Sequence, residues 1–137
     1  MYPTRSELTA ELCELFEKSG YTIYGAIDCP ALPPPELLTN GRFGHLQDVQ
    51  PDVEAFDSKT QRAIYGIVCA NKKEIDSEAT LTTWNVCLNQ VKRKNEQQPL
   101  VVTIVPASEI GELTSVLTHA LHPEYWESIR LVPSGRF

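Results

Sequence analysis

The 137-residue sequence lacks the features that mark several classes of protein. No apolar run approaches the roughly 18 residues of a membrane-spanning helix, and no signal-peptide pattern opens the chain. None of the four cysteines belongs to a C-x-x-C pair, so neither a zinc ribbon nor a thioredoxin-like redox site is expected. Basic residues number 12 against 18 acidic ones, and the net charge of -6 opposes general binding to polyanions. We therefore expect a soluble, cytoplasmic chain with reduced thiols and no membrane partner.

Motifs for common cofactors and hydrolytic nucleophiles are missing as well. The sequence has no G-x-S-x-G, G-x-G-x-x-G or Walker-type loop, so serine hydrolases, Rossmann cofactors and P-loop nucleotides have no support. His119 and His122 lie near a predicted helix end, with His45 in a loop, but no Cys or carboxylate at a recognised spacing completes a zinc site. We interpret the helix-end pair and the basic run at 92–94 as charges that suit helix C-termini, with a phosphate contact as the alternative for the run. No cofactor is expected.

What the sequence does contain is patterned apolar residues for a single domain over residues 1–137. A hydrophobic fraction of 42% is sufficient for a core without metal or disulfide staples. Thr4 and Glu7 form a T-x-x-E capping box ahead of an apolar stripe, which predicts a helix over 5–18. Periodicity predicts strands at 21–28, 51–56, 63–70, 100–105 and 129–132, and further helices over about 76–93 and 108–121.

The spacing of these elements predicts how the strands pair. The short polar turn at 57–62 indicates an antiparallel hairpin between the strands on either side of it. A strand, a helix and a second buried strand follow one another over 63–105, which is typical of a right-handed β-α-β crossover with parallel strands. We expect a three-layer mixed α/β fold with a central sheet of about five strands, in the order α-β-β-β-α-β-α-β.

A proline-rich stretch interrupts this order at about 29–50. It holds Pro30, Pro33, Pro34, Pro35 and an Asn40-Gly41 turn signal, and it is long for a loop inside one domain. Such a stretch is either an insertion or functional. One hypothesis is that it acts as a protein-interaction module, because prolines pre-order a segment and lower the entropy cost of docking.

The hairpin and crossover carry a family resemblance. Pro51-Asp52-Val53 opens the first hairpin strand, I-Y-G-x-V stands in the second, and V-V-T-I-V-P forms the strand after the crossover helix. This pattern, with Ile75-Asp76-Ser77-Glu78 before the helix, resembles the PD-(D/E)xK nuclease superfamily over roughly residues 50–106. The resemblance implies the restriction-endonuclease-like fold and, in an active member, an Asp and a Glu that bind Mg²⁺ or Mn²⁺ beside a Lys that orients the attacking water.

The resemblance also places the family's site residues on this chain. Asp52 matches the metal-binding Asp, and Gly66 sets the register of the second strand. The Glu position then falls on Ile67 and the Lys position on Cys69, neither of which can supply the required charge. We therefore expect a vestigial, degenerate site at Asp52, Ile67 and Cys69.

A migrated site is the alternative. Glu54 is two residues after Asp52, Lys72 follows the second hairpin strand, and Glu11 stands on the first helix, so each could bring a charge to Asp52. In that case Asp52 and Glu54 would bind the metal. The simpler interpretation is that Glu54, Lys72 and Glu11 are ordinary surface charges.

The leading hypothesis is a non-catalytic protein of this fold with a binding or scaffolding role, linked through the resemblance to nucleic-acid metabolism. Its partner would be an unknown protein, a second copy of the chain in a homodimer, or a nucleic acid, although the net charge does not support the last. The alternatives are an active metal-dependent endonuclease with a migrated site, and a module that works through the Pro-rich stretch.

Overall fold

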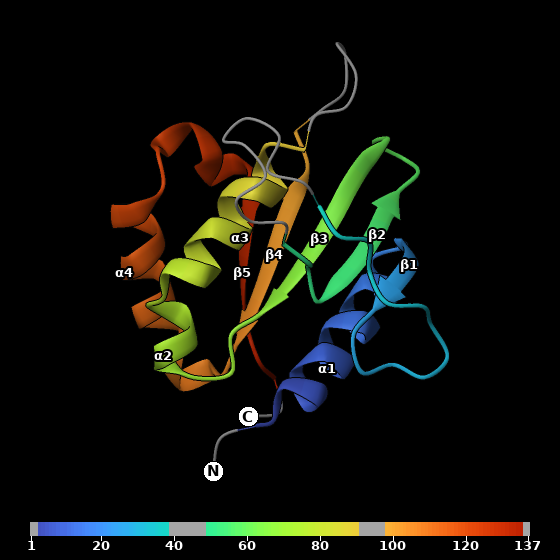
Figure 1. The fold of residues 1–137 in the computed structure, drawn as a ribbon, viewed down its shortest axis with the longest axis horizontal. Helices are drawn as coiled ribbons and strands as arrows, with labels where there is room; N and C mark the ends of the chain where they lie inside the picture. Colours follow the sequence, from blue (N-terminus) through green and yellow to red (C-terminus); the bar gives the residue numbers. More distant parts are fainter. Residues whose placement is uncertain (1–2, 39–48, 91–97, 136–137) are drawn as a thin grey trace.

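The computed structural model describes residues 3–38, 49–90 and 98–135. Its centre is a five-stranded sheet in the order β1-β2-β3-β4-β5, drawn in Figure 1. The strands are β1 (Thr22–Ala26), β2 (Val53–Asp57), β3 (Arg62–Val68), β4 (Leu100–Val105) and β5 (Ile129–Pro133). The first three form an antiparallel meander, whereas β4 is parallel to β3 and to β5. The expected mixed α/β fold with an antiparallel hairpin and a parallel crossover is confirmed.

Helices cover both faces of the sheet. Helix α1 (Arg5–Lys18) lies on one face, while α2 (Lys72–Ile75), α3 (Glu78–Leu88) and α4 (Ile110–Ala120) gather on the other (Figure 1). Two 3-10 turns, Ala107–Glu109 and Pro123–Ser128, precede α4 and β5. The three layers arise because β3 and β4 have apolar side chains on both faces, and each face is buried against its own set of helices.

Helix α1 begins and packs as its sequence predicts. The Thr4 hydroxyl accepts from the Glu7 N–H at 3.2 Å, and Glu7 in return accepts from the Thr4 N–H at 2.9 Å, which confirms the capping box. The helix comes very close to β3, because a Cβ atom at Gly66 would lie 2.6 Å from Leu12 Cδ2 and 3.0 Å from Val53 Cβ. Glycine in the I-Y-G-x-V pattern therefore leaves room for the side chains of Leu12 and Phe16 from α1.

The crossover between β3 and β4 differs from the single helix expected over 76–93. A short α2 comes first, and Asp76 then leaves helical geometry with φ -100° and ψ 59°. Ser77 caps α3, which ends at Leu88 with Asn89 as its C-cap. The helix start expected at Asp76 or Ser77 is confirmed, because Ser77 caps α3. The prediction missed α2, which Asn71 caps, and it placed the helix end near Arg93 instead of Leu88. The basic run at 92–94 lies outside the described residues.

The described part of the Pro-rich stretch wraps around β1. The Ala26 N–H donates to the Pro33 carbonyl at 3.0 Å, and Pro35 packs so closely over Gly25 that a Cβ there would lie 3.0 Å from the proline ring nitrogen. Leu38 and Val49 form an antiparallel bridge and are buried in the core on the α2–α4 side. Residues 29–38 and 49–50 therefore cover the outer edge and one face of β1. Within the described residues, no helix is long and apolar enough to cross a bilayer.

Candidate functional site

Asp52 lies directly before β2, where the ladder with β3 ends. Its N–H donates to the Gly66 carbonyl at 2.9 Å, and its own carbonyl accepts from the Ile27 N–H at 2.9 Å. The residue is buried, with 7% of its surface exposed. A charged side chain is thus held at the junction of β1, β2 and β3, and its carboxylate needs partners from the chain itself.

Both oxygens of the Asp52 carboxylate have such partners. Oδ2 accepts from the main-chain N–H of Val68 at 2.8 Å, and Oδ1 accepts from Arg5 Nη2 at 2.8 Å. The first contact replaces a sheet hydrogen bond with a side-chain one at the end of β3. The second brings a cation from the first turn of α1 to the position where the family resemblance implies a divalent metal.

Arg5 joins Asp52 to a second carboxylate that the motif does not indicate. Its Nη1 forms an ion pair with Glu74 Oε1 and also donates to the Val68 carbonyl at 3.1 Å. Glu74 Oε2 accepts from the Ala70 N–H at 2.7 Å, which fixes the start of α2 against the end of β3. We call Arg5, Asp52 and Glu74 the Arg5 cluster. It ties α1, β2, β3 and α2 together at one end of the sheet.

The pKa values within the Arg5 cluster reflect a balance between burial and pairing. Burial raises the pKa of Asp52 above its ordinary value, against the opposing effects of the Val68 N–H and the Arg5 charge. For Arg5, burial acts to lower the pKa, but the charges of Asp52 and Glu74 together raise it. Arg5 is therefore a permanent cation, and the ionised form of Asp52 depends on it.

Ile67 and Cys69, the residues to which the resemblance assigns the Glu and Lys positions, lie on the face of the sheet opposite α1. Ile67 and Cys69 belong to the core beneath α2–α4, whereas Val68 between them packs on the α1 side, as the alternation of a strand requires. Ile67 is 3% exposed and Cys69 is fully buried. Burial, followed by the nearby charges of Glu74 and Asp52, raises the pKa of the Cys69 thiol to about 12. Cys69 is accordingly a neutral core residue at neutral pH.

The three residues proposed for a migrated site lie as follows. Glu54 accepts from the Glu36 N–H at 3.4 Å, and Glu11 holds the C-terminal segment by accepting from Ser134 Oγ at 2.6 Å and from the Gly135 N–H at 2.7 Å. Lys72 opens α2 with an exposed side chain. In the described residues, none of the three forms a hydrogen bond or ion pair with Asp52.

Sequence reasoning therefore missed Arg5 and Glu74, although each left a signal. A cation in the first turn of a helix opposes the helix dipole, and its presence there indicates a specific anionic partner. Asn71 and Glu74 have the N-x-x-E spacing of a helix start, and the Asn71 side chain indeed accepts from the Glu74 N–H at 3.0 Å. Neither signal identifies Asp52 as the partner, because that contact joins residues 47 positions apart.

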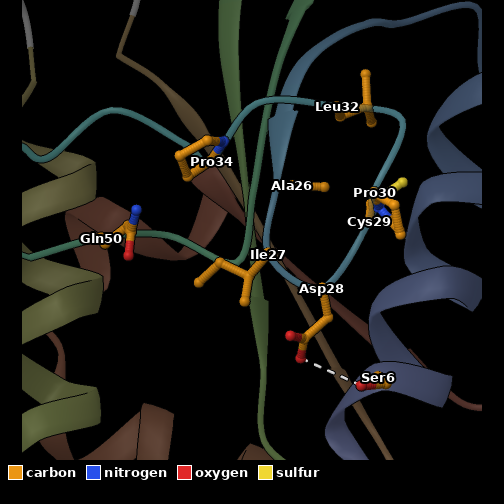
Figure 2. Close-up of a pocket in the computed structure, with 9 residues that line it drawn as sticks. All are labelled: Ser6, Ala26, Ile27, Asp28, Cys29, Pro30, Leu32, Pro34 and Gln50. Atoms are coloured by element: carbon orange, nitrogen blue, oxygen red, sulfur yellow. Dashed lines mark hydrogen bonds between the residues drawn. The ribbon is translucent and has the colours of Figure 1, made fainter.

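An open pocket adjoins the Arg5 cluster. It has a volume of about 650 Å³ and is lined by Ser6, residues 26–30, Leu32, Pro34 and Gln50. Figure 2 shows its walls, formed by the start of α1, the turn after β1 and the Pro-rich stretch. Ser6 directly follows Arg5 in α1, so this helix contributes to both the pocket and the cluster, and the Ile27 N–H of the pocket wall donates to the Asp52 carbonyl.

The histidines that could have suggested a metal serve local roles. His119 Nδ1 lies 2.7 Å from the Ser115 carbonyl one helical turn earlier, and His122 Nδ1 accepts from the Glu124 N–H at 3.2 Å. Across the described ranges, no three His, Cys, Asp or Glu side chains are grouped so that they could hold a metal ion. His45 lies outside those ranges.

No family model, curated protein or solved structure matches this chain. The resemblance to the nuclease superfamily therefore rests on the residues of the hairpin and crossover and on the order of the elements, and the function has to come from the chemistry of the site.

Proposed function

We propose that this protein is a non-catalytic relative of the restriction-endonuclease-like proteins, and that it acts by binding rather than by cutting phosphodiesters. The observation that carries the proposal is the occupation of Asp52. Its two oxygens are taken by the Val68 N–H and by Arg5, an intramolecular cation.

The chemistry of metal-dependent cleavage supports the same conclusion. A divalent metal needs several free oxygen ligands, and it would have to displace Arg5 from two carboxylates at once. The positions that would supply the second carboxylate and the lysine are Ile67 and Cys69, which face a different core. The metal would then lack a full set of ligands, and its bound water would lack a lysine to orient it.

The test is a cleavage assay on supercoiled plasmid, linear DNA and single-stranded RNA with Mg²⁺ or Mn²⁺. We expect no cleavage by the wild type beyond that of the Asp52→Asn variant. Cleavage by the wild type that is lost in Asp52→Asn would overturn the proposal, because this substitution keeps the shape of the side chain while removing its charge.

One observation favours a second candidate, a metal-dependent nuclease that Arg5 holds inactive. Asp52 and Glu74 converge on the same guanidinium, so departure of Arg5 would leave two carboxylates directed at one place. Glu74, rather than the expected Glu54, is the carboxylate that joins Asp52 there.

Removal of Arg5 separates the two candidates. The second candidate requires that Arg5→Ala binds Mn²⁺ and gains metal-dependent cleavage, both of which disappear in Arg5→Ala combined with Glu74→Gln. The first candidate requires that Arg5→Ala shows no cleavage with either metal. Binding of Mn²⁺ by calorimetry and cleavage of plasmid are the two measurements.

A further inference from the structure

The pocket beside the Arg5 cluster has a consistent chemical character. Of the described residues that line it, Asp28 alone carries a charge. Ala26, Leu32 and Pro34 contribute apolar surface, and Ile27 lies between Asp28 and Gln50 in the view of Figure 2. The pocket therefore combines apolar walls with one anionic group at its edge.

The side-chain hydrogen-bonding groups around the pocket are mainly free acceptors. Ser6 already donates its hydroxyl hydrogen to Asp28 Oδ2 at 3.1 Å, and Gln50 donates through Nε2 to the Pro35 carbonyl at 2.8 Å. Within the part of the chain that the structure describes, no other donor reaches the Asp28 carboxylate or the Gln50 amide oxygen, so both remain as acceptors. A ligand that satisfies them has to donate hydrogen bonds.

Among the described residues, the Asp28 carboxylate has a hydrogen bond from Ser6 but no ion pair. Arg5, although adjacent to Ser6, is bound to Asp52 and Glu74, so that the Arg5 cluster carries one positive and two negative charges. Asp28 is therefore the one charged group of the described pocket lining, and its negative charge attracts a cation.

We propose that this pocket is the binding site for a small organic ammonium compound with a short apolar chain. This inference rests on the proposed function, since it names the ligand class for a protein that binds rather than cleaves. The ammonium group donates to the Asp28 carboxylate, while the apolar chain lies against Ile27 and Pro34. The volume of the pocket is within the range of small-molecule sites, about 300–1,000 Å³.

The backbone conformation of Asp28 allows substitutions that remove the carboxylate without straining the turn. Its φ is 58°, a left-handed conformation that glycine and asparagine adopt more easily than most residues. Asp28→Gly and Asp28→Asn should therefore keep the turn after β1 while removing the carboxylate. Asp76→Asn is the matched control, because Asp76 is also an exposed aspartate but lies at the end of α2, outside the pocket lining.

The experiment is a titration of the full chain with hexylammonium, followed by amide chemical shifts in NMR and by calorimetry, with 1-hexanol and hexanoate as neutral and anionic probes. We expect saturable shifts at residues 26–29 and 50 with hexylammonium, and affinity at least about tenfold weaker for 1-hexanol, for Asp28→Asn and for Asp28→Gly. Hexanoate should not bind, and Asp76→Asn should bind as the wild type does.

Three results would overturn the inference: no saturable shifts at the pocket, equal affinity for 1-hexanol, or full affinity in Asp28→Asn. The cleavage assay is a separate readout, which keeps the two proposals distinguishable. Absence of ammonium binding without cleavage would remove only the ligand assignment, whereas Asp52-dependent cleavage would overturn the proposed function itself.

Discussion

Asp52 and Asp28 lie at the same end of the sheet but differ in burial and in the number of their hydrogen-bond partners. Asp52 is buried, and Val68 and Arg5 occupy both of its oxygens. Asp28 is exposed at the rim of a pocket, and Ser6 is its one hydrogen-bond partner among the described residues. The main-chain hydrogen bond between Ile27 and Asp52 shows how near the two segments are. A carboxylate whose hydrogen-bond and ionic partners come from the fold stabilises the structure, whereas an exposed carboxylate with few such partners is available to bind a ligand.

Loss of the two carboxylates should differ most in stability. Asp52→Ala leaves the buried Val68 N–H without its acceptor and removes one of the two carboxylates that pair with Arg5, and we expect it to lower the free energy of unfolding by about 2–4 kcal/mol. Asp28→Asn should change it by less than about 0.5 kcal/mol, as for an exposed position. Urea unfolding of both variants measures the contrast, and equal losses would contradict it.

The cysteine beside each aspartate offers a second contrast. Cys29 follows Asp28 and lines the pocket, whereas Cys69 is fully buried near Asp52 and its pKa is raised to about 12. We expect iodoacetamide at pH 8 to label Cys29 at least about 100-fold faster than Cys69, because Cys69 must wait for the chain to open. Peptide mass spectrometry over time gives both rates. Similar rates in the native protein would show that the core at Cys69 opens readily.

The pH dependence of stability tests the burial of Asp52 directly. Because the folded-state pKa of Asp52 is raised above 3.8, the folded chain holds this proton more tightly than the unfolded chain does. The stability from this proton is fully present below the unfolded pKa and is lost as pH rises through the folded pKa. The difference in unfolding free energy between the wild type and Asp52→Asn should therefore fall across this window and then level off. A difference that grows with pH would mean that pairing with Arg5 outweighs burial.

The smallest expected effect concerns the backbone at Asp28. Glycine adopts a positive φ without the steric cost that other residues incur, so Asp28→Gly should leave the melting temperature unchanged or raise it, with a gain of at most about 1 kcal/mol in stability. Gly20→Ala is the reverse control, because it removes a glycine from a position of positive φ. Gly20 has φ 83°, and a Cβ atom there would meet no heavy atom within 4 Å beyond its chain neighbours. The expected loss of about 1 kcal/mol in Gly20→Ala would therefore come from backbone conformation alone.

Much of the fold could be predicted because its signals are local. The capping box at Thr4, the polar turn between β2 and β3, and the unbroken apolar run of β4 each reside within a few residues. The division of the crossover into α2 and α3 was missed, since two caps only a few residues apart interrupt an otherwise helical pattern. Local propensity decides that an element forms, but the competition between neighbouring caps decides where it ends.

The candidate site was predictable only in part, because its partners are distant in the sequence. The motif indicated Asp52 and the apolar residues at 67 and 69. It did not indicate Arg5, which is 47 positions before Asp52, or Glu74, which lies in α2. Likewise, the position of Asp28 at the rim of an open pocket arises only when the Pro-rich stretch folds back over β1 and lines that pocket.

By itself, the sequence determined that this chain forms a mixed α/β sheet and that Ile67 and Cys69 stand where the resemblance would require Glu and Lys, because periodicity and residue chemistry are properties of the chain alone. Tertiary structure decided which cation neutralises Asp52 and which aspartate stays available to solvent. Those outcomes depend on how α1 packs against the end of β3 and how the Pro-rich stretch packs against β1. Burial and ion pairing change the energy of a carboxylate only when such distant segments come into contact in the folded chain.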